Sequence, residues 1–163
     1  MVMFFGWLLT AIWIGAAGLR SLWFLGRTLK RHSDRFPDPV EWPFLSVVVP
    51  ARDEGHKIEA GLRSLLAADY PQFEILALDD RSRDETGDIM DRLAAEDAAS
   101  SRSVLQVIHI KDLPDGWLGK NHALWVGSQR AKGDWILFTD GDVIYQPDTL
   151  RRAVKFAMAR NID

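Results

Sequence analysis

Cysteine is absent from the 163-residue chain, and its absence excludes disulfide bonds, thiolate metal sites and a cysteine nucleophile. Any bound metal ion must therefore be held by oxygen or imidazole ligands. The chain also lacks a run of lysine or arginine, and its formal net charge is −3, so we expect no nucleic-acid partner. A chain of this length has room for about one domain.

Two common nucleotide-binding motifs are also missing. No G-x-G-x-x-G sequence follows the first expected strand, which argues against a dinucleotide-binding Rossmann site. The segment Gly116–Asn121 lacks the spacing and the Ser or Thr of a Walker A loop. A nucleotide site in this chain must therefore be formed by other residues.

Charged residues are missing from Met1–Leu19, and the apolar run resumes after Arg20 as far as Gly26. About 20 apolar residues span a bilayer as a helix, so we expect Met1–Gly26 to be a transmembrane anchor. No basic residue precedes the run, which argues against a secretory signal peptide. The alternative is an apolar helix that packs on the domain.

The basic residues near this run all lie on its C-terminal side, which predicts that the chain from residue 27 onward is cytoplasmic. The protein is then expected in the inner (plasma) membrane, with a single span. Residues 27–44 carry three prolines and alternating charge, which is typical of a linker. The basic residues are Arg20, Arg27, Lys30, Arg31 and Arg35.

From Leu45 onward, short apolar runs alternate with helical patterns, which is typical of an α/β fold with a mostly parallel sheet and helices on both faces. The run at 135–139 is short and strongly apolar, so we expect it to be a buried strand. The domain is expected to cover 45–163. The expected strands are 45–49, 73–78, 104–110 and 135–139, and the expected helices are 58–66, 86–98, 120–131 and 147–159.

Acidic side chains follow three of the four expected strands. Because the carboxyl ends of parallel strands meet at one edge of a sheet, these side chains should lie together there. Such a concentration of negative charge requires cations or hydrogen-bond donors, and a nucleotide with its metal supplies both. The residues at the three strand ends are Arg52, Asp53 and Glu54; Asp79 and Asp80; and Asp140 and Asp142.

Asp140 and Asp142, separated by one glycine, suit Mg²⁺ or Mn²⁺ held together with substrate phosphates. The alternative is an Asp-Gly turn that closes a hairpin. Lys120 follows a glycine at the start of a helix, where the helix dipole would help it to bind phosphate.

The other residues also have simpler interpretations. Asp79 and Asp80 would serve equally as caps of the following helix, and Glu54 as a solvated acid of a first turn. Lys120 would serve as an exposed helix-start lysine. His56 and His122 have no partner at metal-ligand spacing, and we expect them to be ordinary histidines. The joint placement of the acids at consecutive strand ends favours a nucleotide site.

Four segments, in this order, resemble the successive motifs of a family 2 glycosyltransferase of the GT-A fold, over about residues 45–160. That resemblance implies a Rossmann-like, mostly parallel sheet. The loop Leu113–Lys120 is similar to that of membrane-anchored members associated with hopanoid and carotenoid pathways. The four segments are Val47–Glu54, Leu78–Thr86, Gly119–Leu124 and Phe138–Asp142.

The resemblance implies a nucleotide-diphosphate sugar as donor, with a UDP-sugar favoured. It places Lys120 near the diphosphate, and it matches Asp140 and Asp142 to the family's D-x-D, which binds Mg²⁺ or Mn²⁺. Gly141 stands where the family often has Ala or another small residue, and we expect no consequence. The residues that would hold uracil and ribose are Pro50, Ala51, Arg52, Glu54, Asp79 and Asp80.

The resemblance also implies a general base many tens of residues after the D-x-D, whereas Asp163 lies 21 residues past Asp142. We therefore expect the donor half of a glycosyltransferase here, with the general base beyond Asp163 and an acceptor for which a lipid is one candidate. One alternative is a catalytically silent, membrane-tethered nucleotide-sugar-binding module. Another is a sugar nucleotidyltransferase, which the lack of a glycine-rich, basic phosphate loop disfavours.

Overall fold

The computed structural model describes residues 36–161, which form parts of two compact units. The first unit is Val40–Arg151, and the described part of the second is 36–39 with 152–161. In the second unit, Lys155 Nζ donates a hydrogen bond to Asp38 Oδ1 at 2.8 Å. The predicted span Met1–Gly26 lies outside the described residues, among which no helix has the length and apolarity needed to cross a bilayer.

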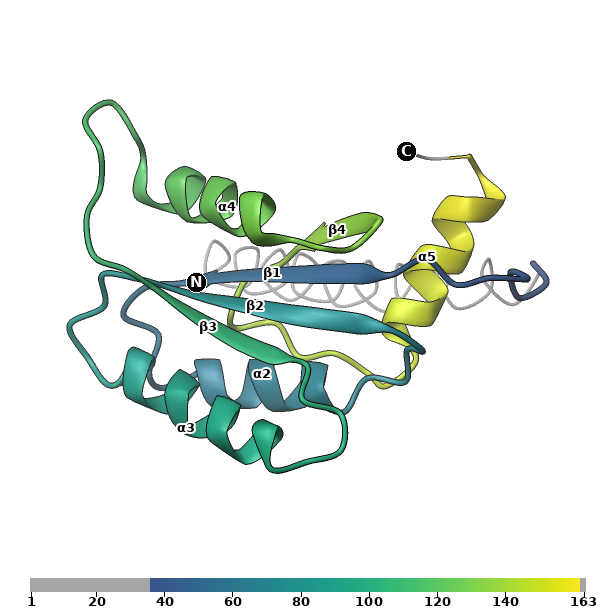
Figure 1. Ribbon diagram of the computed structural model, residues 1–163, viewed down its shortest axis with the longest axis horizontal. Coiled ribbons are helices and arrows are strands. Elements are labelled where there is room, and N and C mark those ends of the chain that lie inside the picture. The colour runs from purple at the N-terminus through teal and green to yellow at the C-terminus, as the bar shows by residue number, and fades with distance from the viewer. Residues whose placement is uncertain (1–35, 162–163) are drawn as a thin grey trace, which may run out of the picture. The chain divides into compact units, whose positions relative to one another are not determined.

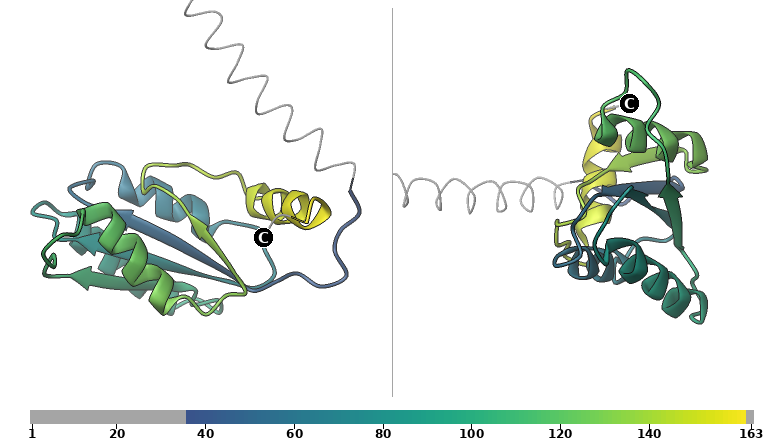
Figure 2. Two further views of the ribbon diagram at one scale, coloured as in Figure 1. Left: turned by 90° about the horizontal axis from the view of Figure 1, so that it is seen from above. Right: turned by 90° about the vertical axis from the view of Figure 1, so that its left-hand side faces the viewer.

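The expected alternation of strands and helices is confirmed. Four parallel strands form one sheet in the order β3-β2-β1-β4. Helices α2 and α3 cover one face of the sheet and α4 lies on the other (Figure 1, Figure 2). The elements are β1 (Leu45–Ala51), α2 (Ile58–Leu66), β2 (Phe73–Asp80), α3 (Thr86–Ala98), β3 (Leu105–Ile110), α4 (Gly119–Arg130), β4 (Trp135–Phe138) and α5 (Thr149–Ala159).

The strand order positions the site. From β1 the chain moves outward to β2 and β3, and it then returns to place β4 on the opposite side of β1. Ligands of open α/β sheets bind at such a reversal of strand order, beyond the carboxyl ends of the strands. All four strands end at this edge, and the acidic residues that the sequence singled out lie at the end of β2 and in the loops after β1 and β4.

The core lies on both faces of β1 and β2, which explains why these strands are apolar without alternation. On one face, Ile58, Leu62 and Leu65 of α2 are fully buried at helical spacing. On the other face, Ala123 of α4 packs in a buried cluster with Val48. Full burial of an apolar side chain of this size contributes about 1.5–3 kcal/mol.

The sequence predicted that β4 would be buried, but the strand is partly exposed. Ile136 and Phe138 are 40% and 48% exposed, and they alternate with the half-buried Trp135 and Leu137. Within the described residues β4 pairs only with β1, and α4 contacts β1 and β2. Apolar composition predicted the strand correctly, but it did not reveal that one side of the strand has no covering layer in this unit.

A buried polar cluster fixes the chain just before β4. Ser46 Oγ and the backbone N–H of Lys132 both donate to Glu74 Oε1, each at 2.7 Å. Gly133 N donates to Ser46 Oγ at 2.8 Å, and a Cβ on Gly133 would lie 2.5 Å from Ser46 N. These contacts set where β4 begins, and therefore where the residues that follow it emerge.

Helix α4 approaches β1 closely because residue 127 is glycine. A Cβ there would lie 2.4 Å from Val48 Cγ1 and 3.1 Å from Leu78 Cδ1. We predict that Gly127→Ala lowers the free energy of unfolding by about 1 kcal/mol, because overpacking costs about 1–3 kcal/mol and outweighs the gain in helix propensity of about 1 kcal/mol. Urea denaturation measures the change. Gln129→Ala, exposed on the same helix, is the control, and a Gly127→Ala variant as stable as this control would contradict the packing.

Candidate functional site

Asp79 and Asp80 are the last two residues of β2, and they point to opposite faces of the sheet. A Cβ on Gly87 of α3 would lie 2.9 Å from Asp79 Oδ2, and a Cβ on Gly119 of α4 would lie 2.6 Å from Asp80 Oδ2. Neither aspartate caps α3. Instead, Asp84 Oδ1 accepts a hydrogen bond from Thr86 N at 3.0 Å. The capping alternative is therefore wrong.

Asp80 is paired with its neighbour Arg81. Arg81 Nε and Nη2 donate to the two carboxylate oxygens at 2.8 and 3.1 Å, and this pairing raises the pKa of Arg81. The backbone at Arg81 is left-handed, with φ of 59°. The Asp80 side chain is 5% exposed, so its fork-to-fork contact with the guanidinium is largely shielded from water.

Asp79 is held from two sides. Its Oδ1 accepts a hydrogen bond from Ser82 N at 3.1 Å, and its Oδ2 lies 3.0 Å from His109 Nδ1. Burial alone would raise the pKa of Asp79, but the bonds from Ser82 and His109 outweigh it and hold the pKa below its ordinary value. Asp79 is therefore ionised across the neutral range.

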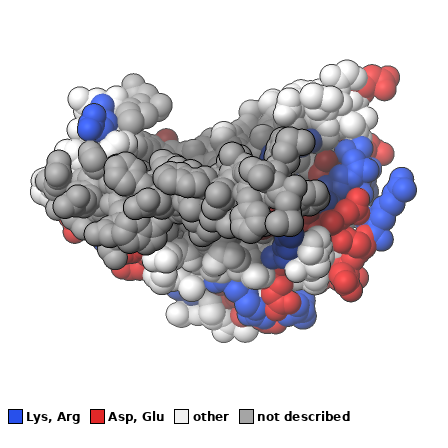
Figure 3. Space-filling view, turned by 180° about the vertical axis from the view of Figure 1, so that it is seen from behind, with Lys and Arg blue, Asp and Glu red and all other residues white. Residues whose placement is uncertain are grey.

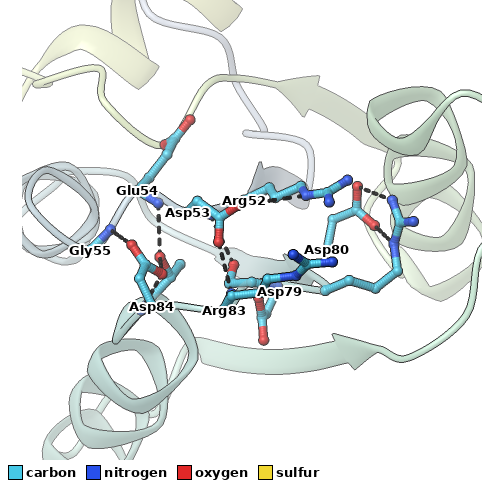
Figure 4. A network of polar contacts seen from close by, with 11 residues as sticks. Arg52, Asp53, Glu54, Gly55, Asp79, Asp80, Arg83 and Asp84 are labelled. Carbon is cyan, nitrogen blue, oxygen red and sulfur yellow. Dashed lines mark hydrogen bonds and ion pairs between the residues drawn. The ribbon is translucent and has the colours of Figure 1, made fainter.

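The loop after β1 is bonded along its length to the loop after β2 (Figure 4). Because these contacts join backbone groups to side chains, they hold both loops in one conformation before any ligand binds. The bonds are Asp53 N to Ser82 Oγ (3.1 Å), Arg83 N to Asp53 Oδ1 (2.7 Å), Glu54 N to Thr86 Oγ1 (2.8 Å) and Gly55 N to Asp84 Oδ2 (2.9 Å).

Asp53 takes part in this loop contact. Its backbone is left-handed, with φ of 54°, and its Oδ2 lies 3.7 Å from Arg52 Nε. Pro50 and Ala51 are the last two residues of β1 and are buried, so they have chiefly backbone atoms to offer a ligand. Arg52 and Glu54 leave the strand with their side chains at the edge.

Asp140 and Asp142 are exposed, and each is paired with a different lysine. Lys120 Nζ, from the first turn of α4, donates to Asp140 Oδ1, and Lys57 Nζ, next to α2, lies 3.3 Å from Asp142 Oδ2. Exposed ion pairs of this kind contribute about 0–1 kcal/mol, so a divalent cation can replace them readily. Figure 3 shows basic and acidic side chains next to one another at the right of the view.

Between the two aspartates, Gly141 packs tightly on β1 and α2. A Cβ at residue 141 would lie 2.7 Å from Glu54 Oε2 and 2.8 Å from Ile58 Cδ1. On the other side, a Cβ on Gly61 would lie 2.1 Å from the carbonyl oxygen of Gly141. Close packing therefore explains why residue 141 is glycine, which the sequence did not reveal. This tight fit also brings Glu54 close to the segment that carries Asp140 and Asp142.

Glu54 is the strongest sign that a cation belongs here. Its Oε2 is buried and accepts no hydrogen bond, and burial, followed by repulsion from Asp142 and Asp140, raises its pKa. Lys57 and Lys120 offset this only in part. A hard divalent ion held by Asp140 and Asp142 would therefore relieve the charge around this unsatisfied oxygen.

The described residues contain no preformed cluster of three or more metal-ligating side chains. An ion held by Asp140 and Asp142 would thus complete its coordination with water and phosphate oxygens, as Mg²⁺ commonly does. The structure adds Lys57 to the residues that the sequence predicted. It lies 85 residues from its partner Asp142, and no local pattern marked it.

His122 belongs to no metal-ligating cluster within the described residues, but its surroundings are unusual. It is buried against both Trp117 and Trp125, with ring centroids 5.3 and 6.0 Å away, and its Nδ1 has no hydrogen-bond partner. The two tryptophans are partly exposed, at 38% and 49%. His122 and Trp125 lie on α4 and Trp117 lies in the loop before it, and the sequence gave no sign that the three rings pack together.

The chain matches known proteins over this same region. The model of the family described as "Glycosyl transferase family 2" matches residues 46–163. The chain is 31% identical over 125 residues to an undecaprenyl-phosphate 4-deoxy-4-formamido-L-arabinose transferase of Pseudomonas syringae, covering 74% of this chain and 34% of that protein. It is 32% identical over 102 residues to a Staphylococcus aureus 4,4'-diaponeurosporenoate glycosyltransferase, covering 62% and 24%.

Solved structures agree. The mannosyltransferase PcManGT of Pyrobaculum calidifontis, in complex with GDP-Man and Mn²⁺, superposes with a TM-score of 0.64 at 28% identity over 90% of this chain and 43% of that one. Residues 1–349 of S. aureus TarS with UDP-GlcNAc give 0.56 at 28% identity, over 72% and 32%. The chain thus spans less than half the length of the proteins that it matches here.

The raised pKa of Glu54 predicts a change in stability. An ionised Glu54 destabilises the folded, metal-free protein, so wild-type stability falls as pH rises through the raised folded pKa. We predict that Glu54→Gln raises the melting temperature in EDTA at pH 7, and that the gain is lost as pH falls below 4.5, where Glu54 is protonated in both the folded and the unfolded state. Differential scanning fluorimetry checks this, with the exposed Glu41→Gln as control. A Glu54→Gln variant that melts lower than wild type at pH 7 would contradict the assignment.

Proposed function

The chain belongs to glycosyltransferase family 2, and we propose that its Val40–Arg151 unit holds the nucleotide-diphosphate sugar donor from which the whole protein transfers a sugar to an acceptor. The observation that carries this proposal is the group of three carboxylates, Glu54, Asp140 and Asp142, beside the bonded loops at the carboxyl edge of the sheet. These side chains concentrate negative charge at the place where the metal ion of a bound metal–diphosphate would neutralise it.

Asp140 and Asp142 would hold Mg²⁺ or Mn²⁺. When bound, the metal supplies neutralisation of the charge that develops on the leaving diphosphate. Lys120, once released from Asp140, would pair with a phosphate, and the backbone N–H groups at the start of α4 would favour the same negative charge. Lys57, released from Asp142, supplies a second positive charge at the same place.

The nucleoside would lie on the two bonded loops. Arg52 and the backbone of Pro50 and Ala51 border it on the β1 side, and Asp79 and Asp80 border it on the β2 side. Ionised carboxylates accept hydrogen bonds from ribose hydroxyls and base N–H groups. Since the loops are already fixed by their mutual bonds, little conformational freedom is lost on binding.

The relatives support the donor and acceptor classes. One solved relative holds GDP-Man with Mn²⁺ and another holds UDP-GlcNAc, and we propose a UDP-sugar as the favoured donor here. One curated relative is named for undecaprenyl phosphate, which supports a lipid acceptor for the whole protein. We assign no general base within 36–161.

We predict that the 163-residue chain in detergent binds UDP in the presence of Mn²⁺ and at least about tenfold more weakly in EDTA, because charged hydrogen-bonding partners contribute about 1.5–3 kcal/mol each. Isothermal titration calorimetry with and without EDTA measures the difference. Equal affinity under both conditions would show that Asp140 and Asp142 do not bind UDP through a metal ion.

Asp142→Asn distinguishes a role of Asp142 in metal binding from a role in stabilising the fold. The exposed pair that this variant loses with Lys57 contributes little stability, so its melting temperature should stay near that of wild type while Mn²⁺-dependent binding weakens. Asp115→Asn, in the exposed loop before α4, is the matched control and should leave both properties unchanged. An Asp142→Asn variant that unfolds would show the pair to be structural instead.

We also propose that Met1–Gly26 anchors the protein in the inner membrane with residue 27 onward in the cytoplasm, since Arg20 lies near the C-terminal end of this span and every other nearby Lys and Arg follows it. A reporter fused after Asp163 tests this topology. We predict fluorescence from a green fluorescent protein fusion and no activity from an alkaline phosphatase fusion. An active phosphatase fusion would show that the topology is the reverse of the one proposed. A product that is absent from the membrane fraction would show that Met1–Gly26 is not an anchor.

A further inference from the structure

His109, on β3, lies outside the residues that the proposed function uses, yet both of its ring nitrogens meet carboxylates. Nδ1 lies 3.0 Å from Asp79 Oδ2 and Nε2 lies 3.0 Å from Asp91 Oδ1. A neutral imidazole has only one N–H, so the ring donates to both carboxylates only as an imidazolium. The geometry therefore describes one cation held between two anions.

The surroundings of the ring favour the charged form. The charged groups that face it are Asp79 from β2 and Asp91 from α3, and the hydrogen bonds to these two raise the pKa of His109. The other close neighbour on α3 is Gly87, which carries no charge. Asp79 is the drier end of the bridge, since its side chain is 13% exposed against 59% for Asp91. The bond to Asp79 is therefore the stronger of the two.

From Asp79 the contacts continue into both loops of the candidate site. Asp79 Oδ1 accepts from Ser82 N, and Ser82 Oγ accepts from Asp53 N, each at 3.1 Å. Arg83 N then donates back to Asp53 Oδ1 at 2.7 Å. A displacement of the Asp79 carboxylate would thus loosen the start of the β2 loop, and through it the β1 loop.

We propose that His109 is a positioning residue for donor binding: held by Asp91, its imidazolium fixes the Asp79 carboxylate and, through Ser82 and Asp53, the two loops on which the nucleoside lies. This inference rests on the proposed function, since it assigns His109 a role in the same site without contact with the ligand. Asp91, at the far end of the bridge, keeps the ring charged and oriented.

If His109 positions the two loops in this way, nucleotide affinity should depend on pH. Loss of the proton from His109 leaves one N–H for two carboxylates, so the Asp79 loops lose support as pH rises through the raised pKa of His109. The lowered pKa of Asp79 keeps that carboxylate ionised through the same range. Nucleotide affinity should therefore be full at lower pH and fall above the His109 midpoint.

The experiment combines calorimetry and NMR on the 163-residue chain in detergent, with UDP and Mg²⁺ as the probe. We expect wild-type affinity to fall about fivefold across the His109 midpoint, the scale of one ordinary intramolecular hydrogen bond. The Ser82 and Asp53 amide signals should titrate with the same midpoint as the His109 ring, and that midpoint should lie above 6.5, the ordinary pKa of histidine. His109→Leu should bind about fivefold more weakly at low pH and lose this step.

Three further variants separate positioning from folding. His109→Gln keeps one N–H for Asp79, so it should recover part of the affinity without the pH step. Asp91→Asn keeps an acceptor but removes a charge at an exposed position, so it should fold normally and move the step to lower pH. His56→Gln, at an exposed histidine, should leave the profile unchanged.

The outcomes distinguish this inference from the function on which it rests. If wild type binds UDP and Asp91→Asn and His109→Leu keep both its affinity and its pH profile, the positioning role is overturned while the proposed function stands. If His109→Leu does not fold, an unmoved step in Asp91→Asn overturns the role by itself. If wild type binds no nucleotide at any pH, the proposed function fails and this role fails with it.

Discussion

The burial of Glu54 beside the negative charges of Asp142 and Asp140, at the carboxyl edge of the sheet, is the constraint on which the rest of the site depends. Gly141 places the segment that carries Asp140 and Asp142 directly against Glu54 and Ile58, where any side chain at residue 141 would collide. Two lysines from separate helical regions balance part of this charge, and one carboxylate oxygen remains without a partner. The protein therefore carries a charge imbalance that a divalent cation and a diphosphate would resolve together.

Close packing elsewhere supports this arrangement. Gly127 lets α4 lie near Val48, which brings the start of the helix, with Gly119 and Lys120, to the same edge as Asp80 and Asp140. At the other end of β4, the buried Ser46–Glu74 cluster fixes the chain that leads into the strand. The loops after β1 and β2 are joined by four hydrogen bonds, so the nucleoside side of the site is ordered before a ligand arrives.

Much of this arrangement could be predicted from the sequence, because its signals are local. The period of the apolar residues predicted the order of strands and helices, and the strand ends predicted that Asp79, Asp80, Asp140 and Asp142 would share one edge. What failed or was missed depends on distant partners. The exposure of Phe138 follows from which strands lie beside β4, and the pairing of Lys57 with Asp142 joins residues 85 apart. The bridge through His109 joins β3 to both β2 and α3, and no single stretch of sequence contains it.

Anomalous scattering from Mn²⁺ in crystals of the chain grown with UDP tests the central claim most directly. The account predicts one strong peak within about 2.2 Å of carboxylate oxygens of Asp140 and Asp142, with diphosphate oxygens completing the coordination and both lysines displaced from these carboxylates. Bound UDP with no manganese peak at this position, and with Lys57 and Lys120 still paired to the two aspartates, would contradict it.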